Sequence, residues 1–199
     1  ALLTLVAIIA SWNSVQNLTR FHFALLLALE GGTMGVFVAM DLMLFFLFWE
    51  LILPPIFFLI GLWGAGPQRR GAAMKYMLYM LFSGVLLLFA FVMLAVNHAT
   101  QMGGSIPQSL SFSFPVLLNT TIPDNIQAIV FLLLIIGFAV KIPLVPFHTW
   151  LPTTAVEAPT QLTALLVGLK LGAFGILRFA LPLTPNASVK YAWVLSIVG

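Results

Sequence analysis

Long apolar runs without charge are the feature that most limits how this chain can fold. Residues 131–136, for example, read Phe-Leu-Leu-Leu-Ile-Ile, with no alternation of apolar and polar side chains. A transmembrane β-strand needs that alternation, whereas a spanning helix needs about 20 mostly apolar residues. The 199 residues are 62% hydrophobic and 7% charged, whereas soluble domains contain about 45–50% and 25%. The sequence therefore excludes a soluble globular protein and predicts an all-α, polytopic transmembrane helix bundle.

Polar residues divide the chain into segments of spanning length. Residues 1–10 and 191–199 are apolar but too short to cross a bilayer. We therefore expect a piece of a longer protein, in which residues 1–199 form a single transmembrane domain with a partial helix at each end. The predicted complete spans are Phe21–Ala39, Leu42–Trp63, Met74–Val96, Ile126–Val140 and Gln161–Leu181.

The distribution of cations among the loops predicts how the spans are oriented. Arg69 and Arg70 lie in the loop at residues 66–71, and Lys75 follows it. Residues 97–125 contain no Lys or Arg. Loops rich in Lys and Arg stay on the cytoplasmic side. We therefore place the loop at residues 66–71 on the cytoplasm-like face of a multi-pass integral membrane protein.

Four of the five tryptophans fall near predicted span ends, where amphipathic rings concentrate at membrane interfaces. Trp49 differs because it lies in the middle of a span, beside a glutamate. We therefore expect an interfacial belt made of Trp12, Trp63, Trp150 and Trp193.

The sequence contains no cysteine and carries a formal net charge of +3. The lack of cysteine excludes disulfides and thiolate-held zinc or iron–sulfur centres in these residues. In so apolar a chain, the small cationic excess does not indicate nucleic-acid binding. We expect no cofactor and no metal in this chain, and lipid rather than nucleic acid around it.

Four ionisable residues lie inside predicted spans, where charge is costly. Glu30, Glu50 and Lys170 lie eight or nine residues past the start of a span, and Lys141 ends another. A charged side chain at the centre of a spanning helix costs about 2.5–3.5 kcal/mol. Two interpretations are open: static ion pairs that hold helices together, or a chain of groups that relays protons. The occurrence of ionisable residues in several spans favours the relay.

Two proline clusters interrupt the spans beside these charges. Pro54 has no N–H, so the Glu50 carbonyl loses its helical partner. Pro143 has the same effect on a carbonyl just before Lys141, and Pro146 follows three residues later. The helix is therefore predicted to break after Lys141 at membrane depth, where non-helical backbone must face protein or a water-filled cavity. Broken helices of this kind are typical of transport sites.

Residues near the spans carry three further predictions. Asp41 precedes a span and is expected to form its turn or cap. Gly168 and Gly172 flank Lys170 at the spacing typical of close helix packing, which suits a lysine that faces the bundle interior. His148 is expected to be a polar gate or orienting group near the broken helix.

The motifs around the break resemble the antiporter-like membrane subunits of respiratory complex I. From Val140 the sequence reads Val-Lys-Ile-Pro-Leu-Val-Pro-Phe-His-Thr-Trp-Leu-Pro, and residues 156–160 read Val-Glu-Ala-Pro-Thr. Residues 169–172 read Leu-Lys-Leu-Gly, and residues 41–50 read Asp-Leu-Met-Leu-Phe-Phe-Leu-Phe-Trp-Glu. The strongest resemblance is to chain 4, the D or M type, of NAD(P)H–quinone oxidoreductase. Subunits of multi-subunit Na⁺/H⁺ antiporters are near relatives.

This resemblance implies two inverted five-helix units, each with one broken helix, of which residues 21–181 are the first. It implies that Glu50 is the helix-five glutamate, that Lys141 is the broken-helix lysine paired with it, and that Lys170 relays protons onward. One departure lies at residues 153–155, where Thr-Thr-Ala replaces the Asp-Ala-His usual in the family. The loss of an acid and a histidine alters the standard proton uptake path and fits a specialised variant, such as those of photosynthetic complexes.

The function implied by the resemblance is proton translocation in a redox-driven NAD(P)H– or ferredoxin–quinone oxidoreductase. This chain is expected to carry no redox chemistry, since quinone, NAD(P)H or ferredoxin, and iron–sulfur clusters belong to partner subunits. We expect other membrane subunits as partners, in a bacterial plasma, thylakoid or mitochondrial inner membrane. Two alternatives stay open: a subunit of a multi-subunit Na⁺/H⁺ antiporter and a non-pumping membrane scaffold.

Overall fold

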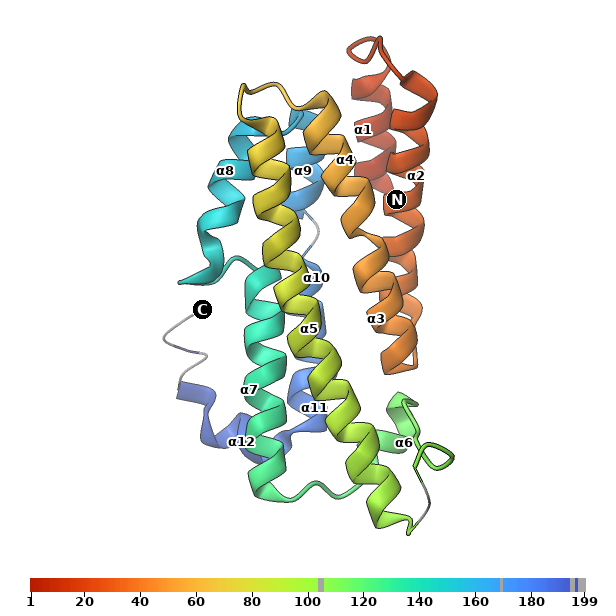
Figure 1. Cartoon of the computed structure of the whole chain (residues 1–199), viewed down its shortest axis with the longest axis vertical. Helices are drawn as coiled ribbons and strands as arrows, with labels where there is room; N and C mark the ends of the chain where they lie inside the picture. The colour runs from red at the N-terminus through yellow and green to blue at the C-terminus, as the bar shows by residue number, and fades with distance from the viewer. Residues whose placement is uncertain (104–105, 169, 194–195, 197–199) are drawn as a thin grey trace.

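Five helical segments of the described residues are long and apolar enough to cross a membrane. The computed structural model describes residues 1–103, 106–168, 170–193 and 196. The longer helices lie side by side along one direction (Figure 1). The predicted all-α transmembrane bundle is therefore confirmed. The five segments are Thr19–Val38, Leu42–Trp63, Arg69–Gln101, Asp124–Lys141 and Thr160–Leu183, the last of which runs through residue 169, outside the described residues.

Shorter helices join and subdivide these spans. The predicted span Met74–Val96 is the middle of a longer helix, α5. The apolar segment predicted from Tyr191 lies partly outside the described residues. The helices are α1 (Leu2–Ser11), α2 (Thr19–Val38), α3 (Leu42–Leu51), α4 (Leu53–Trp63), α5 (Arg69–Gln101), α6 (Phe114–Leu118), α7 (Asp124–Lys141), the 3₁₀ turn η1 (Phe147–Thr149), α8 (Trp150–Glu157), α9 (Thr160–Gly168), α10 (Leu171–Gly175), the π-helical η2 (Ile176–Ala180), α11 (Leu181–Leu183) and α12 (Pro185–Lys190).

The start of the second span is fixed by a side-chain cap. The Asp41 carboxylate accepts hydrogen bonds from the backbone N–H groups of Met43, at 2.9 Å, and Leu44, at 3.0 Å. These are donors that a helix start otherwise leaves without partners. The Leu42 N–H is satisfied by the Phe112 carbonyl at 2.9 Å. The predicted capping role of Asp41 is therefore confirmed.

The two ends of the bundle differ in charge. The beginnings of α2 and α5, which carry Arg20 and Arg69, lie at one end, and the connection from α5 to α7 lies at the other (Figure 1). That connection contains no Lys or Arg. The separation agrees with the loop-charge argument, and the face that meets the cytoplasm stays a prediction.

Aromatic rings from four elements form the centre of the bundle. The Phe45 ring centroid lies 4.5 Å from that of Phe179 and 6.1 Å from that of Phe91. Trp49 meets the Phe138 ring edge-on at 5.4 Å. All five side chains have no exposed surface. Because lipid is as apolar as these rings, close packing rather than exclusion from water holds the helices together.

The second span is not one continuous helix. It divides at Ile52 between α3 and α4, two residues before Pro54. Pro54 has no N–H to donate to the Glu50 carbonyl, which instead accepts a hydrogen bond from the Ile52 N–H. The interruption lies directly beside the Glu50 side chain, so the backbone around this carboxylate departs from regular helix.

Glycines allow α10 to approach α7 closely. A Cβ atom on Gly172 would lie 2.7 Å from the Phe138 carbonyl oxygen, and one on Gly175 would overlap the Phe138 ring. The close packing predicted for Gly172 is therefore present. By contrast, a Cβ on Gly31 of α2 would meet nothing within 4 Å.

We predict opposite effects of alanine at these two positions. Gly172→Ala should lower the free energy of unfolding by about 1–3 kcal/mol, because backbone of α7 occupies the space that a methyl group needs. Gly31→Ala should leave it unchanged or raise it by up to about 1 kcal/mol through helix propensity. Denaturant unfolding of the detergent-solubilised protein tests both. Equal effects of the two variants would contradict the close packing of α10 on α7.

Candidate functional site

The break after α7 is stabilised by replacement hydrogen bonds. Pro143 cannot donate to the Ala139 carbonyl, which instead accepts from the Leu144 N–H at 3.0 Å. The Val140 carbonyl accepts from the indole N–H of Trp150 at 2.8 Å. The Ala139 and Val140 carbonyls, which lose their helical partners at the break, are thus paired within the protein.

Trp150 does not belong to an interfacial belt. Its side chain is 3% exposed and packs inside the bundle, which corrects the prediction made from its position near a span end. The physical reason is the broken helix: a carbonyl without a backbone partner needs a buried donor, and the indole N–H supplies one.

Lys141 is the last residue of α7, and its ammonium group lies against Trp49. The Nζ atom is 3.8 Å from the centroid of the Trp49 ring and 3.5 Å from the Trp49 carbonyl oxygen. An ammonium over an aromatic face gains about 2 kcal/mol or more when it is shielded from water. Trp49, which the sequence placed unusually in mid-span, is therefore the partner that holds this cation.

Glu50 lies beside Lys141 without forming the expected ion pair. One carboxylate oxygen, Oε1, is buried and has no hydrogen-bond partner among the described residues. The carboxylate fills the space next to Gly84 of α5, where a Cβ atom would overlap it. Among the described residues, no Lys or Arg side chain lies within 4.0 Å of an Asp or Glu oxygen.

The predicted direct contact between Glu50 and Lys141 is therefore absent from this structure. The physical reason is that each group has another neighbour: the carboxylate points to Gly84, and the ammonium covers the Trp49 ring. The two charges still belong to adjacent elements of one site, because Lys141 contacts the residue that precedes Glu50.

Lys170 and His148 are placed differently from the expectation. Lys170 precedes α10 and has non-helical backbone angles (φ −85°, ψ 48°). Its side chain is exposed in the described part of the chain instead of facing the bundle interior. His148 lies in η1 and is also exposed. Neither side chain is brought against Lys141 by this part of the chain, and their roles stay predictions.

Side chains of α5 fasten the segment that follows the break. The Lys75 ammonium donates to the Thr149 carbonyl at 2.7 Å and to the Thr153 hydroxyl at 3.1 Å. The Tyr79 and Thr149 hydroxyls lie 2.7 Å apart. Sequence reasoning used Lys75 for orientation alone and missed this contact, because residues more than 70 positions apart give no local signal.

Glu157, at the far end of α8, binds the start of α5. Its carboxylate accepts a hydrogen bond at 2.8 Å from the backbone N–H of Gln68, the residue that caps α5. A negative charge is favourable at the positive end of a helix dipole. The segment from Trp150 to Glu157 is thus bound to α5 at both of its ends.

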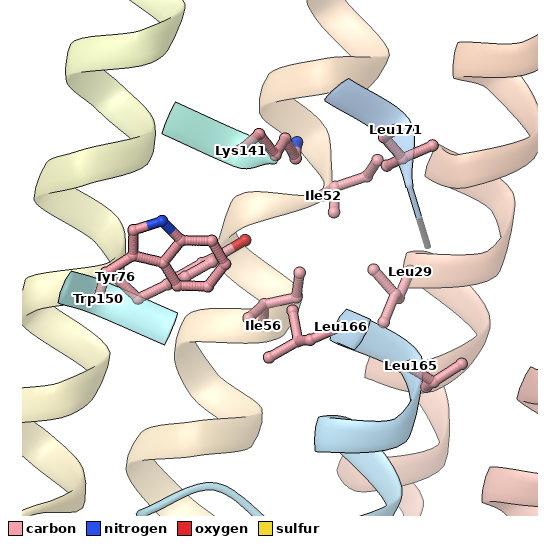
Figure 2. A pocket seen from close by; sticks show the side chains of 9 residues that line it. All are labelled: Leu29, Ile52, Ile56, Tyr76, Lys141, Trp150, Leu165, Leu166 and Leu171. Atoms are coloured by element: carbon pink, nitrogen blue, oxygen red, sulfur yellow. The ribbon is translucent and has the colours of Figure 1, made fainter. Parts of the chain in front are cut away.

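A small cavity lies on the inner side of Lys141. Its volume is about 20 Å³. Figure 2 shows the Lys141 ammonium and the Tyr76 hydroxyl directed from α7 and α5 toward a space bounded mainly by aliphatic side chains. Among the described residues no group of three or more His, Cys, Asp or Glu side chains could hold a metal ion. The lining residues are Leu29, Ile52, Ile56, Tyr76, Lys141, Trp150, Leu165, Leu166 and Leu171.

A polytopic helix bundle with a lysine at a proline-broken helix and a carboxylate on the facing helix defines the antiporter-like class of membrane subunits. Among solved structures, a chain of respiratory complex I from Thermus thermophilus with bound NADH matches with a TM-score of 0.79 at 30% identity, covering 89% of this chain and 36% of that chain. A chain of the Mrp complex from Dietzia sp. DQ12-45-1b shares the fold, with a TM-score of 0.75 at 23% identity over 94% of this chain and 20% of that chain.

The chain belongs to the NADH:quinone oxidoreductase/Mrp antiporter transmembrane family, whose profile matches residues 39–199. It is 39% identical to NADH-quinone oxidoreductase subunit M of Escherichia coli, over all of this chain and 39% of that protein. It is 38% identical to an NAD(P)H-quinone oxidoreductase chain 4 protein of Trichormus variabilis, over all of this chain and 35% of that protein. The resemblance drawn from the motifs is therefore confirmed.

We predict that two lysines of this region affect stability in opposite directions. Lys141→Met keeps the methylene packing and removes a charge that is costly at membrane depth and has no carboxylate within 4.0 Å, so the free energy of unfolding should stay the same or rise by up to about 3 kcal/mol. Lys75→Met removes two hydrogen bonds and should lower it by about 1 kcal/mol. Thermal unfolding of the detergent-solubilised protein measures both. A clear loss for Lys141→Met would contradict the view that its charge is kept at a cost in stability.

Proposed function

We propose that this chain is part of a proton-translocating membrane subunit of a redox-driven NAD(P)H– or ferredoxin–quinone oxidoreductase. The chain spans 35–39% of the length of the two named relatives it matches. The names of those relatives describe quinone oxidoreductase subunits, and the family supports the same role here. The observation that carries the proposal is the Lys141 ammonium at the end of the broken helix, against Trp49 and beside a Glu50 oxygen that has no hydrogen-bond partner among the described residues.

The mechanism that this geometry supports is electrostatic. Two charges 4 Å apart interact by about 4 kcal/mol at an effective dielectric constant of 20. A movement in a neighbouring subunit that changes the separation of Glu50 and Lys141 would therefore change the affinity of the lysine for its proton. We propose that Lys141 passes its proton toward Lys170 and regains one from the cytoplasm-like side, with His148 as a gate on that path.

The redox chemistry is proposed to belong to other subunits. Quinone, NAD(P)H or ferredoxin, and iron–sulfur clusters are expected in those partners, which share the lipid bilayer or its surface with this chain. The cysteine-free sequence offers no thiolate for an iron–sulfur cluster. In this proposal the contribution of the chain is to convert a conformational change into proton movement.

Lys141→Ala should abolish redox-linked proton translocation while the complex still assembles. The reason is that alanine cannot carry a proton, whereas the replacement bonds of the broken helix come from Leu144 and Trp150. Proton uptake into vesicles that contain the complex with the full-length subunit measures the effect. Unchanged proton flux would refute the proposal and favour the non-pumping scaffold.

Glu50→Gln should reduce proton translocation by about tenfold or more, since an amide cannot supply the negative charge that changes the proton affinity of Lys141. Glu157→Gln makes the same chemical change at the cap of α5, where an amide oxygen still accepts the bond from Gln68. We therefore expect this control to translocate protons within about twofold of the unmodified complex. Equal losses in both variants would argue against a specific role for Glu50.

The alternative of a Na⁺/H⁺ antiporter subunit predicts different partners. Flavin- and iron–sulfur-containing subunits should co-purify with the full-length protein if it belongs to a quinone oxidoreductase. A membrane complex without redox subunits, whose proton movement depends on a Na⁺ gradient, would support the antiporter instead. Both kinds of subunit belong to the family of this chain, so co-purification decides between them.

A further inference from the structure

The hydroxyl of Tyr76 is a deeply buried polar group that the proposed proton path does not use. The side chain of Tyr76, on α5, is 1% exposed. Its hydroxyl oxygen has no hydrogen-bond partner among the described residues. A buried phenol O–H normally bonds a protein group or an ordered water. In a membrane-spanning helix, where solvent gives no alternative, this position calls for a specific partner.

The Tyr76 hydroxyl faces the cavity that Lys141 also lines (Figure 2). The cavity has a volume of about 20 Å³, which is enough for a single water. The indole N–H of Trp150, which also borders the cavity, is already bonded to the Val140 carbonyl. The other lining side chains are aliphatic. Tyr76 and Lys141 are therefore the lining residues whose polar side chains can bind a molecule there.

The Lys141 ammonium has more N–H donors than the hydrogen bond to Trp49 uses. It carries three N–H bonds and has no acceptor. The described residues offer it the Trp49 carbonyl at 3.5 Å, a long hydrogen bond, and the face of the Trp49 ring. A water in the cavity would accept a further N–H bond and would have the Tyr76 hydroxyl as a second partner. Two to four polar partners are what a buried water requires.

We propose that Tyr76 is a positioning residue for Lys141: its hydroxyl and the ammonium together hold one water molecule in this cavity. The evidence for the water site is the cavity and the two polar side chains that face it. Its consequence for proton movement rests on the proposed function of the chain.

A phenol is suited to this position because it can donate or accept. When Lys141 is an ammonium ion, the water oxygen accepts from Nζ and a water hydrogen is donated to the Tyr76 oxygen. When Lys141 is a neutral amine, a water hydrogen is donated to the Nζ lone pair and the water oxygen accepts from the Tyr76 O–H. The same three groups thus stay hydrogen-bonded in both protonation states, and no covalent bond of the tyrosine changes. Phenylalanine can do neither.

A purely structural role for Tyr76 makes a different prediction. Its ring packs edge-on against Trp150 at 5.4 Å between centroids, and phenylalanine would keep that contact. If the hydroxyl has no partner, Tyr76→Phe removes an unsatisfied buried group and should raise the thermal unfolding midpoint. If the hydroxyl holds a water, the variant leaves that water with one partner fewer, so the midpoint should stay the same or fall.

The test uses the full-length subunit in its assembled complex. Tyr76→Phe is compared with Tyr191→Phe, which makes the same chemical change where a tyrosine stacks on Phe131 outside the cavity. A structure at a resolution that shows ordered waters should have density between the Tyr76 oxygen and Lys141 Nζ, and Tyr76→Phe should lose it. Redox-linked proton translocation should fall about fivefold, the scale of one lost hydrogen bond, with electron transfer in uncoupled vesicles retained. Tyr191→Phe should change neither.

Other results have distinct meanings. An empty cavity in the unmodified complex, or a raised unfolding midpoint with normal translocation in Tyr76→Phe, would overturn the proposal. If the water is present but Lys141→Ala leaves proton translocation unchanged, the proposed function fails while the water site stands. Normal translocation in Tyr76→Phe with loss in Lys141→Ala would overturn the role of the tyrosine and leave the proposed function intact.

Discussion

The absence of water in the bilayer core is the constraint on which this structure depends. A backbone carbonyl or a charge at that depth must find its partner within the protein. The broken helix shows how this is done: the Leu144 N–H and the Trp150 indole replace the lost helical bonds, and the Trp49 face receives the Lys141 ammonium. With these contacts an irregular, charged segment is tolerated inside an otherwise apolar bundle.

Helix α5 contacts several parts of the site and holds these parts relative to one another. Along one 33-residue helix it supplies the glycine against which the Glu50 carboxylate lies, the tyrosine at the cavity, and the lysine that binds the segment after the break. The moving parts of a proton-handling site need such a frame, because charge separations of a few ångströms decide the interaction energy. The side-chain fastening at Thr149 and Thr153 sets where that segment lies relative to Lys141.

Much of the fold follows from one-dimensional patterns. Apolar run lengths predicted the five spans, Pro143 predicted the break after Lys141, and Asp41 predicted a cap, since each depends on neighbours within a few residues. The site was predicted less completely because side-chain direction depends on contacts distant in sequence. The Glu50 carboxylate lies against Gly84 of α5, Trp150 donates to a carbonyl instead of lying at an interface, and the Lys170 side chain is exposed on the described part of the chain. None of these directions is encoded in hydropathy or residue spacing.

The central claim is that Lys141, at membrane depth, is in contact with water. These 199 residues contain no cysteine, so a single Lys141→Cys substitution gives the chain one reactive thiol. The most direct measurement is the labelling of that thiol by a small, hydrophilic, thiol-specific reagent in intact membranes, with Val130→Cys, at a fully buried position of α7, as the reference. The account predicts labelling at position 141 and none at position 130, because a thiol reacts as a thiolate, which needs water to form. Equal protection of both positions would contradict it.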